Sequence, residues 1–251
     1  MAPTGGGLVP RGEVPGAAAG GTGFRAVLDV DHVGQVLLAA LGPQGWWPAE
    51  TAEEMIIGAV LTQAVAWENA RRAIARLKAA GLCSLAALAA QSPDALAPLI
   101  RETGYFNAKA RKLVALARFF AGKGGLDGLR RAEPAWARRE LLGVYGVGPE
   151  TADAILCYAL SHPAFVADAY ARRVLGRIGV MPASATASYE AAAAWAAREV
   201  RGDAAWLGEL HALLVAVGKD HCKKTAPACA GCPAASLCAY RAAGTRAGPG
   251  G

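Results

Sequence analysis

The sequence predicts an all-α fold from three observations. Between about residues 27 and 241, apolar residues recur three and four positions apart, as Met55 and Ala59 do. Ala, Leu, Arg and Glu, which are compatible with helices, dominate the same stretch. No sustained alternation of β-branched residues indicates a strand. Breaks containing Gly or Pro divide this stretch into roughly ten short helices.

The composition excludes several classes of protein. Hydrophobic residues make up 54% and charged residues 18% of the 251 residues, so the chain has material for a core and is not wholly disordered. Apolar stretches such as AAAAWAA are shorter than the roughly 20 residues that cross a bilayer, so we expect no membrane-spanning segment. Residues 1–24 are predicted to be a disordered tail, and residues 242–251 a frayed one. Without a secretory signal, the chain is expected in the cytoplasm.

The net charge of +6 is unevenly distributed. Residues 101–140 carry 10 basic and 4 acidic side chains, whereas residues 1–100 carry 6 and 8. A basic block beside a nearly neutral remainder is typical of a chain that binds a polyanion on one face. An ordinary solvated helix surface is an equally good interpretation of charge alone.

The stretch LLGVYGVGPETADAILCYAL, residues 141–160, is predicted to be two helices joined by a tight turn. Gly146 and Gly148 flank Val147 and permit the turn, and Pro149 suits the start of the second helix. Such a helix-hairpin-helix presents backbone N–H groups that favour a phosphate. An ordinary αα-hairpin without a ligand has the same pattern.

Asp168 lies in FVADAYARRVLGRIGV, directly before an Arg-rich helix. A carboxylate at this position is typical of a helix N-cap. The functional alternative is a catalytic carboxylate, since the residue follows the hairpin by about twenty positions.

Four cysteines, at 222, 229, 232 and 238, form the pattern C-x6-C-x2-C-x5-C. Four thiols in one short segment of a chain with six cysteines indicate a metal site more than a set of disulfides. Structural zinc and an iron–sulfur cluster both remain open on spacing alone, because zinc sites often use two C-x2-C pairs and this segment has one.

Together, the hairpin, Asp168 and the cysteines resemble the endonuclease III-like branch of the helix-hairpin-helix DNA glycosylase superfamily, over about residues 27–241. The resemblance implies a [4Fe–4S] cluster held by Cys222, Cys229, Cys232 and Cys238. It implies damaged double-stranded DNA as the partner, and a monomeric enzyme associated with the bacterial nucleoid.

The same resemblance implies two helical domains with the DNA cleft between them. Residues 47–162 are expected to form a six-helix domain that contains the helix-hairpin-helix motif. Residues 25–46 and 163–241 are expected to form the iron–sulfur cluster domain, with the cluster loop at its C-terminal end.

The chain departs from the strand-cleaving members of this family at one position. Their lysine, which forms a Schiff base with the sugar, is Glu150 here, and a carboxylate cannot form an imine. Their catalytic aspartate is retained as Asp168, whose implied role is to stabilise the oxocarbenium-like sugar as the base leaves. This combination resembles the 3-methyladenine DNA glycosylase branch.

We therefore expect a monofunctional base-excision DNA N-glycosylase that removes damaged bases, with alkylated purines as the favoured substrates. One alternative is a bifunctional endonuclease III-type glycosylase and abasic-site (AP) lyase that acts on oxidised pyrimidines. The other is a lesion-binding protein with weak activity.

Aromatic residues early in the helical region fit the 3-methyladenine branch. Trp46, Trp47 and Trp67 are expected to line the base pocket, because a tryptophan face attracts a cationic base by about 0.5–2 kcal/mol. Core packing is the alternative for the Trp46–Trp47 pair. Gln63 resembles the wedge residue that fills the gap left by a flipped base, and a solvated helix end is its alternative.

Contacts to the DNA backbone are expected from the hairpin turn and from basic side chains. The candidates are Gly146, Val147, Gly148, Lys109, Arg111, Lys112, Arg172 and Arg173.

Overall fold

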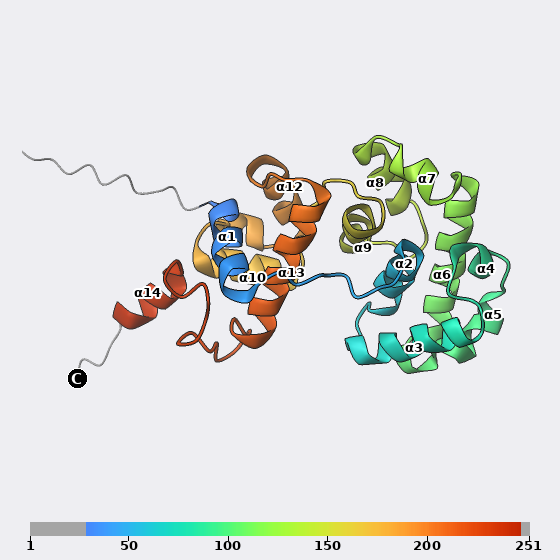
Figure 1. The fold of residues 1–251 in the computed structure, drawn as a ribbon, viewed down its shortest axis with the longest axis horizontal. Helices are drawn as coiled ribbons and strands as arrows, with labels where there is room; N and C mark the ends of the chain where they lie inside the picture. Colours follow the sequence, from blue (N-terminus) through green and yellow to red (C-terminus); the bar gives the residue numbers. More distant parts are fainter. Residues whose placement is uncertain (1–28, 247–251) are drawn as a thin grey trace, which may run out of the picture.

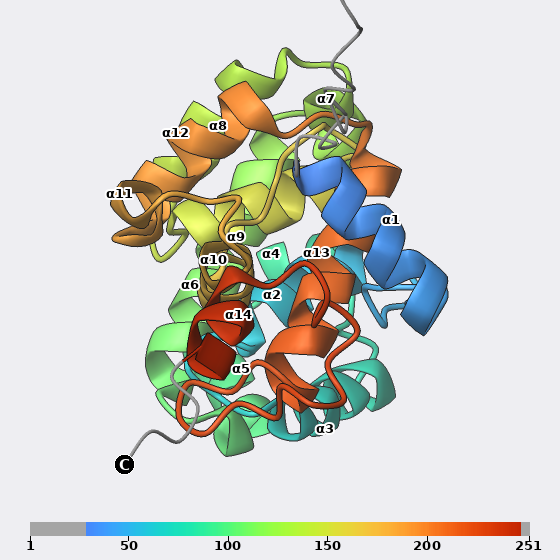
Figure 2. The ribbon, with the colours of Figure 1, turned by 90° about the vertical axis from the view of Figure 1, so that its left-hand side faces the viewer.

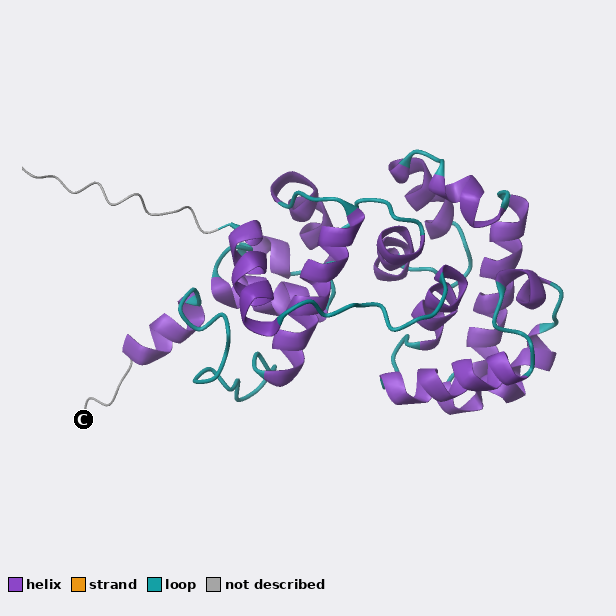
Figure 3. Ribbon diagram, viewed as in Figure 1, coloured by secondary structure: helices purple, strands orange, loops and turns teal. Residues whose placement is uncertain are grey.

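The structure is a computed structural model that describes residues 29–246. Within these residues every regular element is a helix and none is a strand, which confirms the predicted all-α fold (Figure 3). None of these helices is both long and apolar enough to cross a membrane. The elements are α1 (Val30–Leu41), α2 (Ala52–Leu61), α3 (Trp67–Ala79), α4 (Leu85–Ala89), α5 (Pro93–Leu96), the 3-10 helix η1 (Ala97–Thr103), α6 (Phe106–Gly122), α7 (Gly125–Arg130), α8 (Pro134–Leu142), α9 (Pro149–Ala154), the π-helix η2 (Ile155–Ala159), α10 (Ala169–Ile178), α11 (Ala183–Thr186), α12 (Tyr189–Glu199), α13 (Ala204–Asp220) and α14 (Ala239–Arg246).

The described chain has more helical segments than the roughly ten expected from its Gly and Pro breaks. Part of the difference arises because α5 passes directly into η1, and α9 into η2, with no Gly or Pro at either junction. α14 extends to residue 246, so the described part of the predicted frayed tail, residues 242–246, is helical, and the rest of that tail lies outside the described residues. The predicted tail at residues 1–24 lies outside the described residues.

The helices form two groups, joined by two extended segments (Figure 1). One group contains α2 to α9, and the other contains α1 together with α10 to α14. The chain passes between them after α1 and again between η2 and α10. α14 and the loop before it lie over α10, at the end of the molecule farthest from α4 and α5 (Figures 1 and 2). The domain limits given above, at residues 47 and 163, stay predictions.

Most of the longer helices begin at a polar N-cap, which explains where the sequence starts them. The cap side chain accepts a hydrogen bond from a backbone N–H of the first turn, which otherwise has no partner. The capping residues are Asp29, Thr51, Ser84, Ser92, Glu133, Asp168, Ser188 and Asp203.

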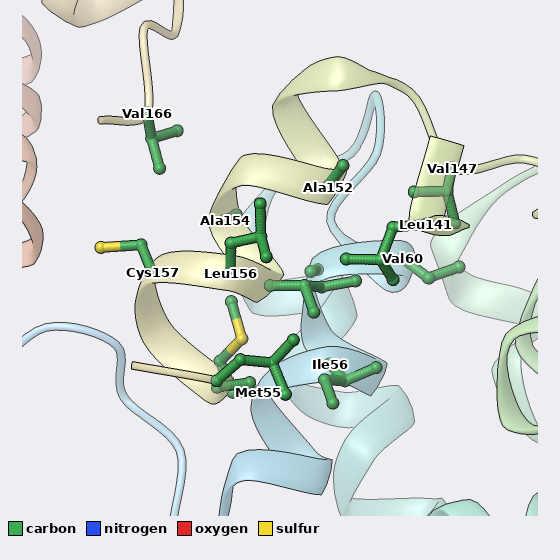
Figure 4. Close-up of a cluster of buried hydrophobic side chains, with 14 of the residues drawn as sticks. Met55, Ile56, Val60, Leu141, Val147, Ala152, Ala154, Leu156, Cys157 and Val166 are labelled. Atoms are coloured by element: carbon green, nitrogen blue, oxygen red, sulfur yellow. The ribbon is translucent and has the colours of Figure 1, made fainter. Parts of the chain in front are cut away.

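α2 is the centre of its group of helices, and its residues from Glu54 to Leu61 are buried on every side. Met55, Ile56 and Val60 pack against side chains from the hairpin and η2 (Figure 4). Because deleting a buried side chain of this size costs about 2–5 kcal/mol, this packing holds the hairpin firmly against α2. The C-terminal end of α2 is thereby fixed beside the start of α9.

Lys109 closes the C-terminal end of α2 from inside the protein. Its Nζ donates hydrogen bonds to the carbonyl oxygens of Leu61 and Thr103, at 2.8 Å each, and the residue is 2% exposed. Burial, followed by the neighbouring charge of Lys112, lowers the pKa of Lys109 to about 8. The expectation that Lys109 contacts DNA phosphate is therefore corrected, because the last carbonyls of a helix need donors and this amine supplies them.

We expect Lys109→Met to lower the free energy of unfolding by roughly 2–4 kcal/mol, because two buried carbonyls lose their donor. Urea unfolding measures the loss, and Arg111→Met, an exposed change on the same helix, serves as the control. The pKa of Lys109 is lower in the folded than in the unfolded chain, so the unfolded chain binds more protons above pH 8. The stability advantage of wild type over the variant should therefore grow from pH 8 towards 10. An unchanged unfolding curve would contradict this role.

Candidate active site

A cavity of about 420 Å³ lies where the two groups of helices meet. Its lining includes six of the side chains argued below: Trp46, Trp47, Trp67, Glu150, Asp168 and His211. A larger hollow of about 720 Å³ lies between α8 and α12, but none of the predicted site residues lines it. The smaller cavity is therefore the candidate active site.

Asp168 reaches this cavity because it is the N-cap of α10. Its Oδ1 accepts a hydrogen bond from the backbone N–H of Ala171 at 2.7 Å, so the N-cap interpretation is correct. Its Oδ2 lies 3.6 Å from Nε2 of His211 at the cavity wall. The capping bond uses one oxygen, and the other remains available for chemistry.

Glu150 lies in the first turn of α9 and lines the same cavity. The residue is exposed, yet the surrounding protein removes part of the solvent from its carboxylate. This desolvation, followed by the charge of Asp168, raises the pKa of Glu150, while the charges of His211 and Arg172 oppose the rise. The two carboxylates are thus close enough to influence one another.

The three tryptophans form one cluster in the cavity wall. The ring centroids of Trp46 and Trp47 are 5.6 Å apart, and that of Trp67 lies 6.4 and 6.0 Å from them. Each ring is half-buried, so packing and pocket lining are combined rather than alternatives. The Nζ of Lys219 lies 5.2 Å from the Trp46 ring centroid, so this aromatic face already holds a cation.

Gln63, in the turn after α2, is bonded to the hairpin. Its Nε2 donates to the carbonyl oxygen of Gly146 at 3.2 Å and to Oγ1 of Thr151 at 3.0 Å, and its Oε1 accepts from Nζ of Lys112 at 2.6 Å. A solvated helix end is therefore the wrong interpretation of Gln63. Its role as a wedge stays a prediction. That role would require Gln63 to break its three hydrogen bonds to the hairpin and Lys112.

The hairpin turn needs glycine at Gly146 for two reasons. Its φ of +82° is in the left-handed region, and a Cβ there would come within 2.2 Å of Cγ of Lys112. Gly148 is the N-cap of α9 and supplies no side-chain cap, so the first N–H groups of that helix lack a side-chain acceptor there. Lys112, Gly146 and Gly148 line one hollow on the outside of this turn, a suitable place for an anion.

Two adjacent arginines of α10, Arg172 and Arg173, differ in their hydrogen bonds. Arg173 donates to the carbonyl oxygens of Cys222 at 2.6 Å and Gly218 at 3.0 Å, so it holds the cysteine loop. Arg172 lines an outer hollow together with Lys224, and Arg111 is exposed on α6. Arg173 also lines this outer hollow, so its contact with DNA stays a prediction.

The four predicted metal ligands all line one small apolar hollow between α10 and the loop that follows α13. Burial raises the pKa of the Cys232 thiol, and the neighbouring thiols of the other three cysteines contribute to the rise. Among residues 29–246, no three cysteine, histidine, aspartate or glutamate side chains are arranged as a metal site. A shared hollow lined by four thiols suits a four-thiolate centre in its donors.

Sequence reasoning missed three residues of the cavity or its wall: Tyr158, His211 and Lys219. Tyr158 lies on η2 against His211, and His211 and Lys219 line the cavity from α13. The spacing of eight residues places His211 and Lys219 near one face of that helix. Nothing in the local pattern indicates that this face meets Asp168.

Comparison with known proteins finds similarity to DNA repair proteins. The family model described as HhH-GPD superfamily base excision DNA repair protein matches residues 57–198. A protein of Methanocaldococcus jannaschii, named for an inferred DNA repair glycosylase activity, is 37% identical over 207 residues, which are 81% of this chain and 93% of that protein. Endonuclease III of Thermotoga maritima is 27% identical over 74% of this chain and 82% of its own length.

A solved structure is similar as well. The crystal structure of the H. pylori 3-methyladenine DNA glycosylase bound to 1,N6-ethenoadenine superposes with a TM-score of 0.62 and 27% identity. The match covers 76% of this chain and 98% of that one.

Proposed function

The chain belongs to the HhH-GPD superfamily of base excision DNA repair proteins, in its endonuclease III-like branch, and we propose that it is a monofunctional DNA N-glycosylase for alkylated purines. Membership makes it a base-excision DNA N-glycosylase. What we propose beyond membership is that the damaged base is an alkylated purine and that the enzyme does not cleave the DNA strand. The observation that carries it is the joint presence of Asp168, Glu150 and three tryptophans around one cavity.

The proposed reaction begins when the damaged nucleotide is rotated out of the duplex, at a cost of a few kcal/mol. The base then stacks in the tryptophan cluster, where it displaces the ammonium of Lys219 from the Trp46 face. Alkylation at a purine ring nitrogen gives the base a positive charge and weakens its glycosidic bond. A face that already binds one cation suits such a base.

Asp168 then stabilises the positive charge that develops on the sugar as the base leaves with the bonding electrons. Water adds to the sugar carbon and loses a proton, and the products are an abasic site and the free base. Glu150 lines the same cavity, but it has no amine to attack the sugar. Strand cleavage through a Schiff base is therefore absent from the proposed reaction.

The DNA backbone is proposed to lie across the hairpin turn and the outer side of α10. The turn at Gly146–Gly148 offers backbone N–H groups, and the contacts from side chains come from Arg111, Lys112 and Arg172. Gln63 is proposed as the wedge, since it lies between the cavity and the hairpin.

We expect Glu150→Lys to gain crosslinks to abasic DNA that borohydride traps, because it restores an amine beside Asp168. The measurement is a gel shift of the protein after reduction. Glu199→Lys, which adds the same charge at an exposed position of α12, is the matched control and should give no crosslink. Trapping by the wild type would show that another amine acts, and would favour the bifunctional alternative.

We also propose that Cys222, Cys229, Cys232 and Cys238 hold a [4Fe–4S] cluster, because all four thiols line one hollow and the family resemblance carries this ligand pattern. The cluster would fix the loop before α14 and takes no part in base release. We expect bound iron and an absorbance band at about 400 nm. Both should be reduced in Cys232→Ser and retained in Cys83→Ser. Bound zinc without that band would overturn the cluster.

The test of function is incubation with duplexes that carry 3-methyladenine, thymine glycol, uracil or an abasic site, with and without alkali. We expect release of 3-methyladenine, with strand breaks that appear after alkali. Breaks without alkali on thymine glycol would support the bifunctional alternative. Binding without base release would support the lesion-binding alternative.

A further inference from the structure

A buried imidazole faces Asp168 from α13, and we propose that His211 is a positioning residue for Asp168 in base release. This inference rests on the proposed function and adds a residue to its machinery. His211 is 5% exposed, and its Nε2 lies 3.6 Å from Oδ2 of Asp168. Among the described residues, this nitrogen has no hydrogen-bond partner although it is fully buried. An unsatisfied polar atom directed at a catalytic carboxylate calls for an explanation.

The other side of the imidazole ring is held in place. Its Nδ1 lies 2.6 Å from Oη of Tyr158, and that Oη lies 3.0 Å from the carbonyl oxygen of Gly208, on the same helix as His211. The tyrosine ring packs so closely on Gly208 that a Cβ there would lie 3.0 Å from it. Since Tyr158 is fixed by its packing, it orients the imidazole, and Nε2 points towards Asp168.

The proposed role of His211 needs an N–H on Nε2, because only a donor is attracted to the Asp168 carboxylate. The shorter of the two Tyr158 contacts, at 2.6 Å, allows the tyrosine hydroxyl to donate to Nδ1, which leaves the proton of the imidazole on Nε2. The contact between Nε2 and Oδ2 of Asp168 is then a charge-assisted one.

The groups that face the ring are of both signs. Asp168 faces Nε2 from α10, and Glu150 on α9 and Lys219 on α13 line the same cavity. Asp168 is the side chain in contact with Nε2, so an N–H on that nitrogen is directed at an acidic group.

The proposed role of His211 is to fix the direction of the Asp168 carboxylate. The backbone of Ala171 holds Oδ1 of Asp168, and His211 is the side chain that faces Oδ2. With both oxygens held, the carboxylate keeps one orientation towards the sugar. At 3.6 Å the second contact is longer than a hydrogen bond, and such contacts commonly tighten when substrate fills a site.

The test compares single-turnover base release from a 3-methyladenine duplex with the dissociation constant for DNA that carries an abasic analogue. His211→Leu should slow release about 10- to 100-fold, the usual effect of losing a hydrogen bond to a charged group, and should change DNA binding by less than about twofold. His211→Gln, which keeps an N–H donor, should recover most of the rate. Tyr158→Phe keeps the ring packing and should slow release in the same direction by a smaller factor.

His162→Leu is the matched control. His162 is also a buried histidine, bonded to the carbonyl oxygen of Leu129 and away from the candidate cavity, so its loss should affect stability and not release. In an Asp168→Asn background, His211→Leu should slow release no further, because it acts through Asp168. The inference would be overturned if folded His211→Leu released base at the wild-type rate, or if His211→Gln recovered none of the lost rate. It would also be overturned if the rate effects of His211→Leu and Asp168→Asn were fully additive. Failure of the wild type to release any base would instead overturn the proposed function.

Discussion

Asp168→Asn should slow release of 3-methyladenine by about 10³-fold, because the negative charge that stabilises the developing oxocarbenium ion is lost. Asparagine has the same shape, and its side-chain oxygen still accepts the hydrogen bond from Ala171 that caps α10. We therefore expect the free energy of unfolding to change by less than about 1 kcal/mol, and DNA binding to be preserved. Single-turnover release and binding to an abasic analogue measure the two effects separately.

Asp203→Asn is the matched control for this variant. Asp203 caps α13 with the same geometry, accepting a hydrogen bond from the backbone N–H of Trp206 at 2.8 Å, and it does not line the candidate cavity. Any loss due to capping alone appears in both variants. Turnover by Asp168→Asn at the wild-type rate would remove Asp168 from the mechanism.

Asp153→Ala should have the largest effect on stability. Asp153 is 4% exposed, and it accepts hydrogen bonds from Arg138 at 2.7 and 3.0 Å and from the hydroxyl of Tyr189 at 2.8 Å. It therefore links α8 and α9 to α12, which belongs to the other group of helices. Removal leaves a guanidinium and a hydroxyl without their partner, and we expect a loss of about 3–5 kcal/mol in the free energy of unfolding.

Urea unfolding of Asp153→Ala measures this loss. Asp127→Ala breaks a more exposed ion pair of similar composition, Asp127 with Arg130 at 3.4 Å, and should cost less than about 1 kcal/mol. The pKa of Tyr189 is raised, first by burial and then by the charge of Asp153, so the alanine variant should lower it. A stability change equal to that of Asp127→Ala would show that the buried link contributes little.

The fold class and several parts of the candidate site were readable from the chain because their signals are local. The N-cap at Asp168, the left-handed turn at Gly146 and the shared hollow of the four cysteines each depend on residues close in sequence. The family resemblance places Glu150 at the position of the lysine in the same way, and this equivalence stays a prediction. Each of these features has a signal in neighbouring residues of the sequence.

The direction in which a side chain points could not be predicted from neighbouring residues in the sequence. Lys109 and Arg111 belong to one basic segment, yet the first caps α2 from inside and the second is exposed. Arg172 and Arg173 are adjacent, yet Arg173 holds the cysteine loop through carbonyl oxygens 45 and 49 residues away. Charge alone does not tell which face of a helix becomes buried.

From the sequence alone it follows that this protein is helical and that its hairpin and cysteines resemble those of a DNA glycosylase, with Glu150 at the position that the resemblance gives to the lysine. Which side chains meet Asp168 follows from the tertiary structure. His211 is 43 positions further along the chain than Asp168, and Tyr158 is 53 positions before His211. Their contact results from the packing of α10, α13 and η2, because burial of apolar faces, rather than any local pattern, brings these helices together.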